Sequence, residues 1–106
     1  MVSLNTHRSG SVRSIIFREK GEWFGVALEF NIIEAGDSPE EVMMLLDEAV
    51  RGYVESAKKA KLSIRVLNQV PDPEYEALWN TQAKPAGRRG KQIYRLSSQP
   101  ISALAL

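Results

Sequence analysis

The sequence contains no cysteine, a single histidine (His7), and no run of about 18 apolar residues of the kind that crosses a bilayer. Without cysteine the chain has no disulfide, no thiol nucleophile and no cysteine-bound metal, which fits a reducing compartment. Residues 1–10 are polar and lack the apolar stretch of a secretory signal. These absences predict a cytoplasmic protein without a membrane segment.

Acidic residues are missing from the end of the chain. Residues 80–106 carry five basic side chains and no acidic one, whereas residues 1–79 carry nine basic and 13 acidic side chains, a net charge of −4. An acidic body with a basic tail predicts that partners are selected by opposite charge. The plain alternative, which the sequence leaves open, is a solvated tail that serves solubility.

Hydrophobic alternation predicts three strands in the first third of the chain. Residues 12–19 and 22–30 flank a turn at Lys20-Gly21, and residues 32–35 form a short third strand. Consecutive strands with such short connections are typical of an antiparallel meander. The side chains of the second strand that are expected to face the core are Phe24, Val26, Leu28 and Phe30.

A helix start follows the third strand. Ser38 can accept a hydrogen bond from the amide three residues on, and Pro39 suits the first helical position. Glu41 can reach back to complete a capping box. Apolar residues then recur at three- and four-residue spacing as far as about Ala60. The spacing predicts one long amphipathic helix with an apolar stripe.

The second half of the chain is less regular. Residues 62–70 alternate weakly and are expected to form a fourth strand or an extended connector, and residues 72–79 a short capped helix. Residues 93–96 can form a brief strand within an otherwise irregular tail. The predicted organisation is a flexible leader at 1–10, an α+β domain at 11–79, and a basic then apolar tail at 80–106.

The predicted fold class is α+β, with a three- to four-stranded, mainly antiparallel sheet packed on one long helix, a short second helix and an irregular C-terminal tail. One face of the sheet would lie on the long helix. The opposite face, with Ile16, Trp23 and Ala27, is too apolar for full exposure. We therefore predict self-association, as a dimer, through that face or through an exposed strand edge.

No residue set matches a catalytic or metal-binding pattern. His7 lies in the leader, and Ser56 and Lys59 are ordinary neighbours on a helix surface. Helix capping and solvated helix faces explain the carboxylates. We predict no catalytic residue, no metal and no cofactor, and hence a protein that is not an enzyme. A metal-dependent hydrolase that acts through clustered carboxylates is kept as a third alternative.

The segment WFGVALEFNIIEAGDSPEE, residues 23–41, carries a strand that ends in Leu-Glu-Phe-Asn-Ile, then Gly-Asp-Ser, then an acidic capped helix. This order resembles the HicB-like antitoxin family, with similarity over residues 12–60 and again over 70–79. The resemblance implies a partial RNase H-like core without the catalytic carboxylates, which binds and masks a small basic RNA-cleaving toxin of the HicA type. Many members add a C-terminal DNA-binding segment. Residues 80–106 depart from that pattern, which leaves an orphan without a toxin as the alternative.

Two surfaces are predicted to bind partners. A basic protein of this toxin type would dock by charge complementarity on acidic side chains. The residues expected to receive it are Glu22, Glu34, Asp37, Glu40 and Glu41. The alternative function is nucleic-acid binding, in which arginine and lysine side chains contact phosphates. The residues expected to do so are Arg88, Arg89, Lys91 and Arg95.

Overall fold

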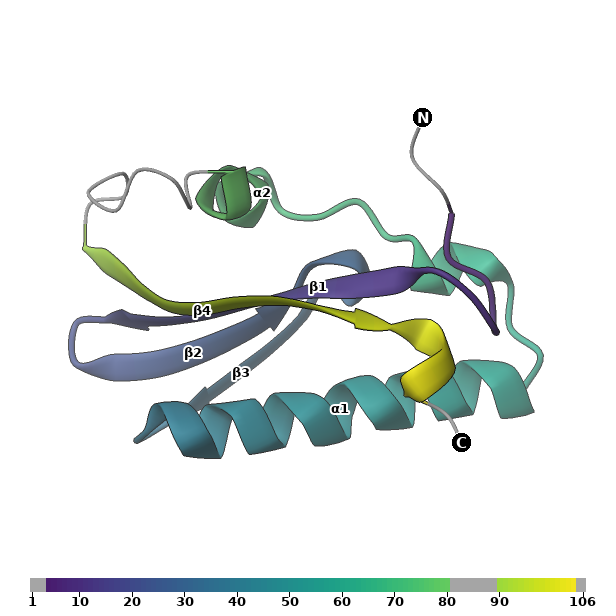
Figure 1. Ribbon diagram of the computed structural model, residues 1–106, viewed down its shortest axis with the longest axis horizontal. Coiled ribbons are helices and arrows are strands. Elements are labelled where there is room, and N and C mark those ends of the chain that lie inside the picture. The colour runs from purple at the N-terminus through teal and green to yellow at the C-terminus, as the bar shows by residue number, and fades with distance from the viewer. Residues whose placement is uncertain (1–3, 81–89, 105–106) are drawn as a thin grey trace.

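The computed structural model describes residues 4–80 and 90–104 and confirms the α+β fold (Figure 1). The strands and helices, in chain order, are β1 (Ser11–Glu19), β2 (Glu22–Ala27), β3 (Ile32–Gly36), α1 (Pro39–Lys59), α2 (Pro73–Asn80) and β4 (Lys91–Pro100). Three short 3-10 turns, η1 to η3, cover Leu28–Phe30, Ile64–Leu67 and Ile101–Ala103. No helix in the two described ranges is long and apolar enough to cross a membrane.

The sheet has the strand order β3-β2-β1-β4, and each neighbouring pair is antiparallel. Its fourth strand is β4, which has ten residues where a brief strand was expected at 93–96. This part of the C-terminal tail is therefore a regular strand, whereas an irregular tail was expected. Residues 62–70, the other candidate for a fourth strand, contain the η2 turn instead. Ser63 caps that turn by accepting from the Arg65 amide, and Leu67 is buried. The weak alternation therefore reflects a turn.

Helices cover both faces of the sheet (Figure 1). α1 lies on the face that carries Ile16 and Ala27, which are 3% and 0% exposed, and Trp23 packs against the same cluster. The prediction that this face is open was wrong, because it placed the alternate set of residues beneath the long helix. These three residues therefore form no open apolar face for self-association. A dimer stays a prediction that rests on the strand edges.

The opposite face of the sheet belongs to α2. Leu78 of α2 is fully buried there, with Tyr75 and Trp79 packed at its sides. The sheet and η1 residues of this second core are Ile15, Phe17, Val26 and Leu28, with Phe24 partly buried beside them. The short helix α2 thus covers the face of the sheet that the alternation had assigned to the long helix α1.

β2 ends three residues earlier than expected, because Leu28–Phe30 turns as η1 and Asn31 takes the left-handed conformation (φ 54°, ψ 38°). The turn breaks the alternation. Leu28 stays with the α2 core, whereas Phe30 joins the α1 core, where its ring centroid lies 4.7 Å from that of Tyr53. The connection from β2 to β3 is therefore held by packing on both faces.

The start of α1 follows the predicted capping pattern with one change. The Ser38 hydroxyl accepts from the Glu41 amide (3.1 Å), with Pro39 in the first helical turn. The Glu41 carboxylate accepts from the Asp37 amide (2.8 Å), one residue before the expected donor. A Cβ at Gly36 would lie 2.6 Å from this carboxylate, so the glycine that ends β3 makes room for the cap.

Asn5, which lies in the segment expected to be a flexible leader, packs on the fold. Asn5 is buried, and its Nδ2 donates to the Leu67 carbonyl (2.8 Å). Its Oδ1 accepts from the Ser11 amide (2.7 Å). The side chain of Asn5 thus forms hydrogen bonds with one backbone group of the η2 turn and one at the start of β1. The polar composition of the segment does not reveal these contacts.

Candidate functional site

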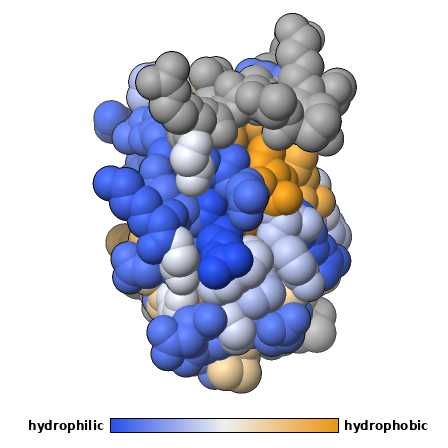
Figure 2. Space-filling model, turned by 90° about the vertical axis from the view of Figure 1, so that its left-hand side faces the viewer, coloured by the Kyte–Doolittle hydropathy of each residue, from blue (hydrophilic) through white to orange (hydrophobic). Residues whose placement is uncertain are grey.

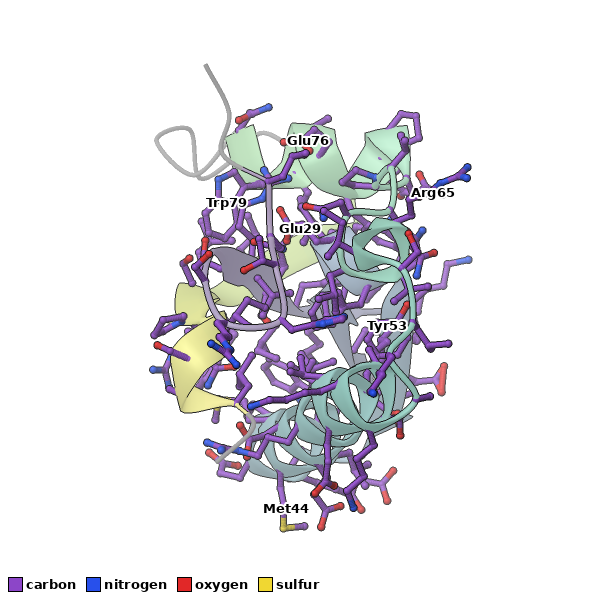
Figure 3. The ribbon with its side chains drawn as sticks, turned by 90° about the vertical axis from the view of Figure 1, so that its right-hand side faces the viewer. Glu29, Met44, Tyr53, Arg65, Glu76 and Trp79 are labelled. Carbon is purple, nitrogen blue, oxygen red and sulfur yellow. The ribbon has the colours of Figure 1, made fainter. Side chains whose placement is uncertain are left out.

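Arg13 on β1 joins two carboxylates that are distant in the sequence. Its Nε donates to Glu29 Oε2 (2.6 Å), while Nη1 and Nη2 donate to Glu76 Oε2 and Oε1 (2.6 and 2.8 Å). The guanidinium carbon lies 5.6 Å from the centroid of the Trp79 ring. Figure 3 shows Glu29, Glu76 and Trp79 near one another on the α2 side of the molecule. We call Arg13, Glu29 and Glu76 the Arg13 clamp.

The charged groups of the Arg13 clamp shift one another's pKa values. The hydrogen bond from Arg13 lowers the pKa of Glu76 below its ordinary value, although burial acts in the other direction. The same hydrogen bond is the main reason that the pKa of Arg13 is raised above its ordinary value. Because Glu76 is held ionised and bidentate, the clamp ties α2 and η1 to β1. It supplies no free acid or base.

Sequence reasoning did not identify the Arg13 clamp. The two carboxylates lie 16 and 63 residues from Arg13, so no local spacing connects the three side chains. Glu29 is the one partial signal, since it is a carboxylate within an otherwise apolar strand pattern. Such a residue is often paired when it is partly buried.

Lys91 at the start of β4 is held in a similar way. Its Nζ lies 3.0 Å from Glu19 Oε2 and 2.5 Å from Glu74 Oε2, and its side chain is 12% exposed. The hydrogen bond to Glu74 contributes most to a pKa of Lys91 above the ordinary value. Lys91 therefore ties β4 and α2 to the β1–β2 hairpin. This removes it from the predicted phosphate-binding set.

The other residues of the predicted phosphate-binding set do not form a cluster in the described ranges. Arg95 is exposed on β4, and its guanidinium contacts Met43 Sδ at 3.8 Å. Arg88 and Arg89 lie outside the described residues. The described part of the chain therefore presents one exposed arginine from this set and no basic cluster.

The predicted protein-binding carboxylates meet at one end of the sheet. The antiparallel register of β2 and β3 brings the start of one strand beside the end of the other, so Glu22 and Asp37 adjoin. α1 begins directly afterwards, with Glu40 and Glu41 in its first turn. We call this set the acidic corner, which consists of Glu22, Glu34, Asp37, Glu40 and Glu41.

The carboxylates of the acidic corner have no cationic partner among the described residues. The acidic side chains that do form ion pairs there are Glu19, Glu29, Asp47, Glu55, Glu74 and Glu76. In the acidic corner Glu34 is half-buried and the other four side chains are exposed. Figure 2 views this end of the molecule and shows a mainly hydrophilic surface. The acidic corner therefore makes no ion pair with the described residues, although Arg18 and Lys20 lie on the adjoining β1–β2 hairpin.

β3 forms one edge of the sheet and leads into the acidic corner. Within the described ranges no strand pairs with its outer side, so backbone N–H and C=O groups are free there. Ile33 on this strand is 54% exposed. It pairs with Val26 of the α2 core, so it lies on the face away from α1. An edge of this kind beside unpaired carboxylates can receive an extended segment of another protein.

A search for metal-binding side chains among the described residues and comparisons with known proteins add no information about function. Residues 4–80 and 90–104 contain no group of three His, Asp or Glu side chains placed to hold a metal ion. Comparisons with protein-family models, with curated proteins and with solved structures find no match. The likeness to HicB-like antitoxins thus stays a prediction from the sequence.

Proposed function

We propose that the protein is a non-catalytic, cytoplasmic protein-binding module of the HicB-like antitoxin type. In this proposal the acidic corner and the β3 edge receive a small basic protein of the HicA-like toxin class. The observation that carries it is a contrast between carboxylates. Those that pack within the fold are paired with Arg13 and Lys91, whereas those of the acidic corner have no cation among the described residues.

Two physical effects support this function. Uncompensated carboxylates speed the association of a basic partner and disfavour an acidic one. A free strand edge supplies main-chain hydrogen bonds at regular spacing. Because no ion pair in the described ranges involves the acidic corner, lysine or arginine side chains of a partner can bind it without breaking an existing pair.

The test is capture of the partner from a host lysate at about 50 mM salt, where charge-driven association is weakly screened. The test variant, Glu22→Gln with Glu40→Gln, removes two carboxylates from the acidic corner and keeps the Glu41 cap. The matched control, Glu48→Gln with Glu55→Gln, removes two exposed carboxylates elsewhere on α1. We expect a small basic protein on the parent chain and the control, and about tenfold less on the test variant.

A second measurement separates a toxin from any other basic protein. The captured protein should cleave RNA when it is free and lose that activity when this chain is added. Higher salt should also release it, since the attraction is electrostatic. Equal capture by both variants, or a captured protein that this chain does not inhibit, would contradict the proposal.

A further inference from the structure

β4 forms the second edge of the sheet, and in the described part of the chain no strand pairs with its outer side. Its register with β1 shifts between Ile16 and Phe17, which leaves Tyr94 as the extra residue of a β-bulge. At the other end, Pro100 closes the strand and has no N–H to donate. The bulge and the proline therefore delimit a regular free edge at residues 95–99.

A groove of about 190 Å³ lies between this edge and α1. Its apolar wall and floor consist of Ile16, Met43 and Leu46. Its polar rim on β4 consists of Arg95, Ser97 and Gln99. These three alternate along the strand and share one face. A strand added to the free edge would therefore place alternate side chains over the same groove.

Three polar side chains of the groove make no hydrogen bond with any described residue. Ser14 on β1 lines the groove and is 6% exposed, and its hydroxyl makes no hydrogen bond with any described residue. The side chains of Ser97 and Gln99 make none with the described residues either. The Ser14 hydroxyl is not among the buried unpartnered atoms of the described residues, so it is accessible from the groove. The Ser14 hydroxyl is therefore available to donate to a polar group that enters the groove.

The uncompensated charge of the groove is positive. Asp47 also lines it, but its Oδ2 accepts from Arg51 Nε (2.8 Å). Arg51 is held in turn by the Ala103 carbonyl (3.0 Å). Arg95 has no carboxylate partner within residues 4–80 and 90–104, and its guanidinium contacts Met43 Sδ. A group that binds between Arg95 and the hydroxyls is therefore expected to be anionic.

We propose that the free edge at 95–99 and the groove beneath it bind an extended peptide segment of a partner protein that carries an acidic side chain. The segment adds a fifth strand by pairing with the backbone of β4. Its carboxylate enters the groove, where Arg95 binds it and the hydroxyls of Ser14 and Ser97 donate to it. The site lies on the sheet edge opposite β3 and does not depend on the function proposed for the acidic corner.

Charge argues against a second copy of β4 as the occupant. β4 contains no acidic residue, so a second copy of β4 would supply no carboxylate for Arg95. The other edge, β3, carries Glu34, so head-to-tail association of two copies is the competing outcome. The test below distinguishes that outcome by measuring the mass of the free chain.

The probe is a fluorescent, end-blocked heptapeptide, Val-Thr-Val-Glu-Val-Thr-Val, and binding to the full chain is measured by fluorescence anisotropy. We expect saturable binding that weakens about tenfold with Arg95→Gln. Ser14→Ala should weaken it about threefold, because one hydrogen bond is lost. The matched control is Arg65→Gln, which changes an exposed arginine on η2 and should leave binding unchanged.

Two altered peptides separate the parts of the proposal. A peptide with glutamine in place of glutamate should bind about tenfold more weakly, and one with N-methylated central amides should not bind, because it cannot pair as a strand. No binding by the parent chain, equal binding of the glutamine peptide, or full binding of the methylated one would overturn the proposal. A mass from light scattering above that of one chain, which falls to that of one chain with Arg95→Gln, would show association of two copies through β4 and would also overturn it.

Discussion

Replacement of Glu76 by glutamine leaves Arg13 with one carboxylate instead of two. Two charge-assisted hydrogen bonds of 2.6 and 2.8 Å join these side chains. Hydrogen bonds to charged groups contribute roughly 1.5–3 kcal/mol each, but the side chains of Arg13 and Glu76 are 24% and 36% exposed, so solvent screens the pair. Glutamine can also keep one bond. We therefore expect Glu76→Gln to lower the free energy of unfolding by about 1–2 kcal/mol.

Urea denaturation followed by tryptophan fluorescence measures this change, since the Trp79 ring lies 5.6 Å from the Arg13 guanidinium. A double-mutant cycle of Glu76→Gln with Arg13→Leu should give a coupling of about 1–2 kcal/mol. The same cycle on Lys59 and Glu55, 3.6 Å apart and 77% and 58% exposed, should give under about 0.5 kcal/mol. Equal coupling in the two pairs would refute the view that the Arg13 clamp holds α2.

The Arg13 clamp also sets a pH dependence. The hydrogen bond from Arg13 lowers the folded-state pKa of Glu76 below its ordinary value of 4.5, so the unfolded chain binds this proton more tightly. Its contribution to stability is fully present above the unfolded pKa and is lost as the pH falls through the folded pKa. Glu76→Gln should thus destabilise the protein at pH 7 and destabilise it progressively less as the pH falls below 4.5. A loss that does not change as the pH falls would be contrary evidence.

Four further outcomes are expected. Lys91, with its pKa raised above 10.5, contributes stability that is complete below that value and is lost as the pH rises through the folded pKa, so Lys91→Met should flatten the alkaline fall in unfolding free energy. Gly36→Ala should lower the melting temperature measured by circular dichroism, because the added Cβ meets Glu41 Oε1 at 2.6 Å. Ser14→Ala should not lower the free energy of unfolding, and a loss above about 1 kcal/mol in urea would show that the hydroxyl has a partner. Arg95→Gln should leave any gel shift of single-stranded RNA at about 50 mM salt unchanged, whereas loss of a shift would favour the nucleic-acid alternative.

The elements that the sequence predicts best are those set by neighbouring residues. The capping residues of α1 stand in one row from Ser38 to Glu41, and the turn at Lys20-Gly21 separates two alternating runs. The same holds for Glu34, Asp37, Glu40 and Glu41 of the acidic corner, which flank one strand end and one helix start, whereas Glu22 joins them through the pairing of β2 with β3. Local chemistry is enough for such features.

The errors concern which element covers which face. Alternation shows that Phe24 and Val26 share a face, but it does not show that the short helix α2, through Leu78, covers them. The Arg13 clamp and the Lys91 ion pairs were missed for a related reason. Their partners meet only after α2 has packed on the sheet, and Lys91 lies 72 residues from Glu19.

Amide NMR of the chain during titration with the captured basic protein shows where that partner binds. We expect shift changes to concentrate on β3 and the first turn of α1, and to diminish in the Glu22→Gln, Glu40→Gln variant. Changes centred on α2, or on β1 beside the Arg13 clamp, would contradict the assignment of the acidic corner as the binding surface.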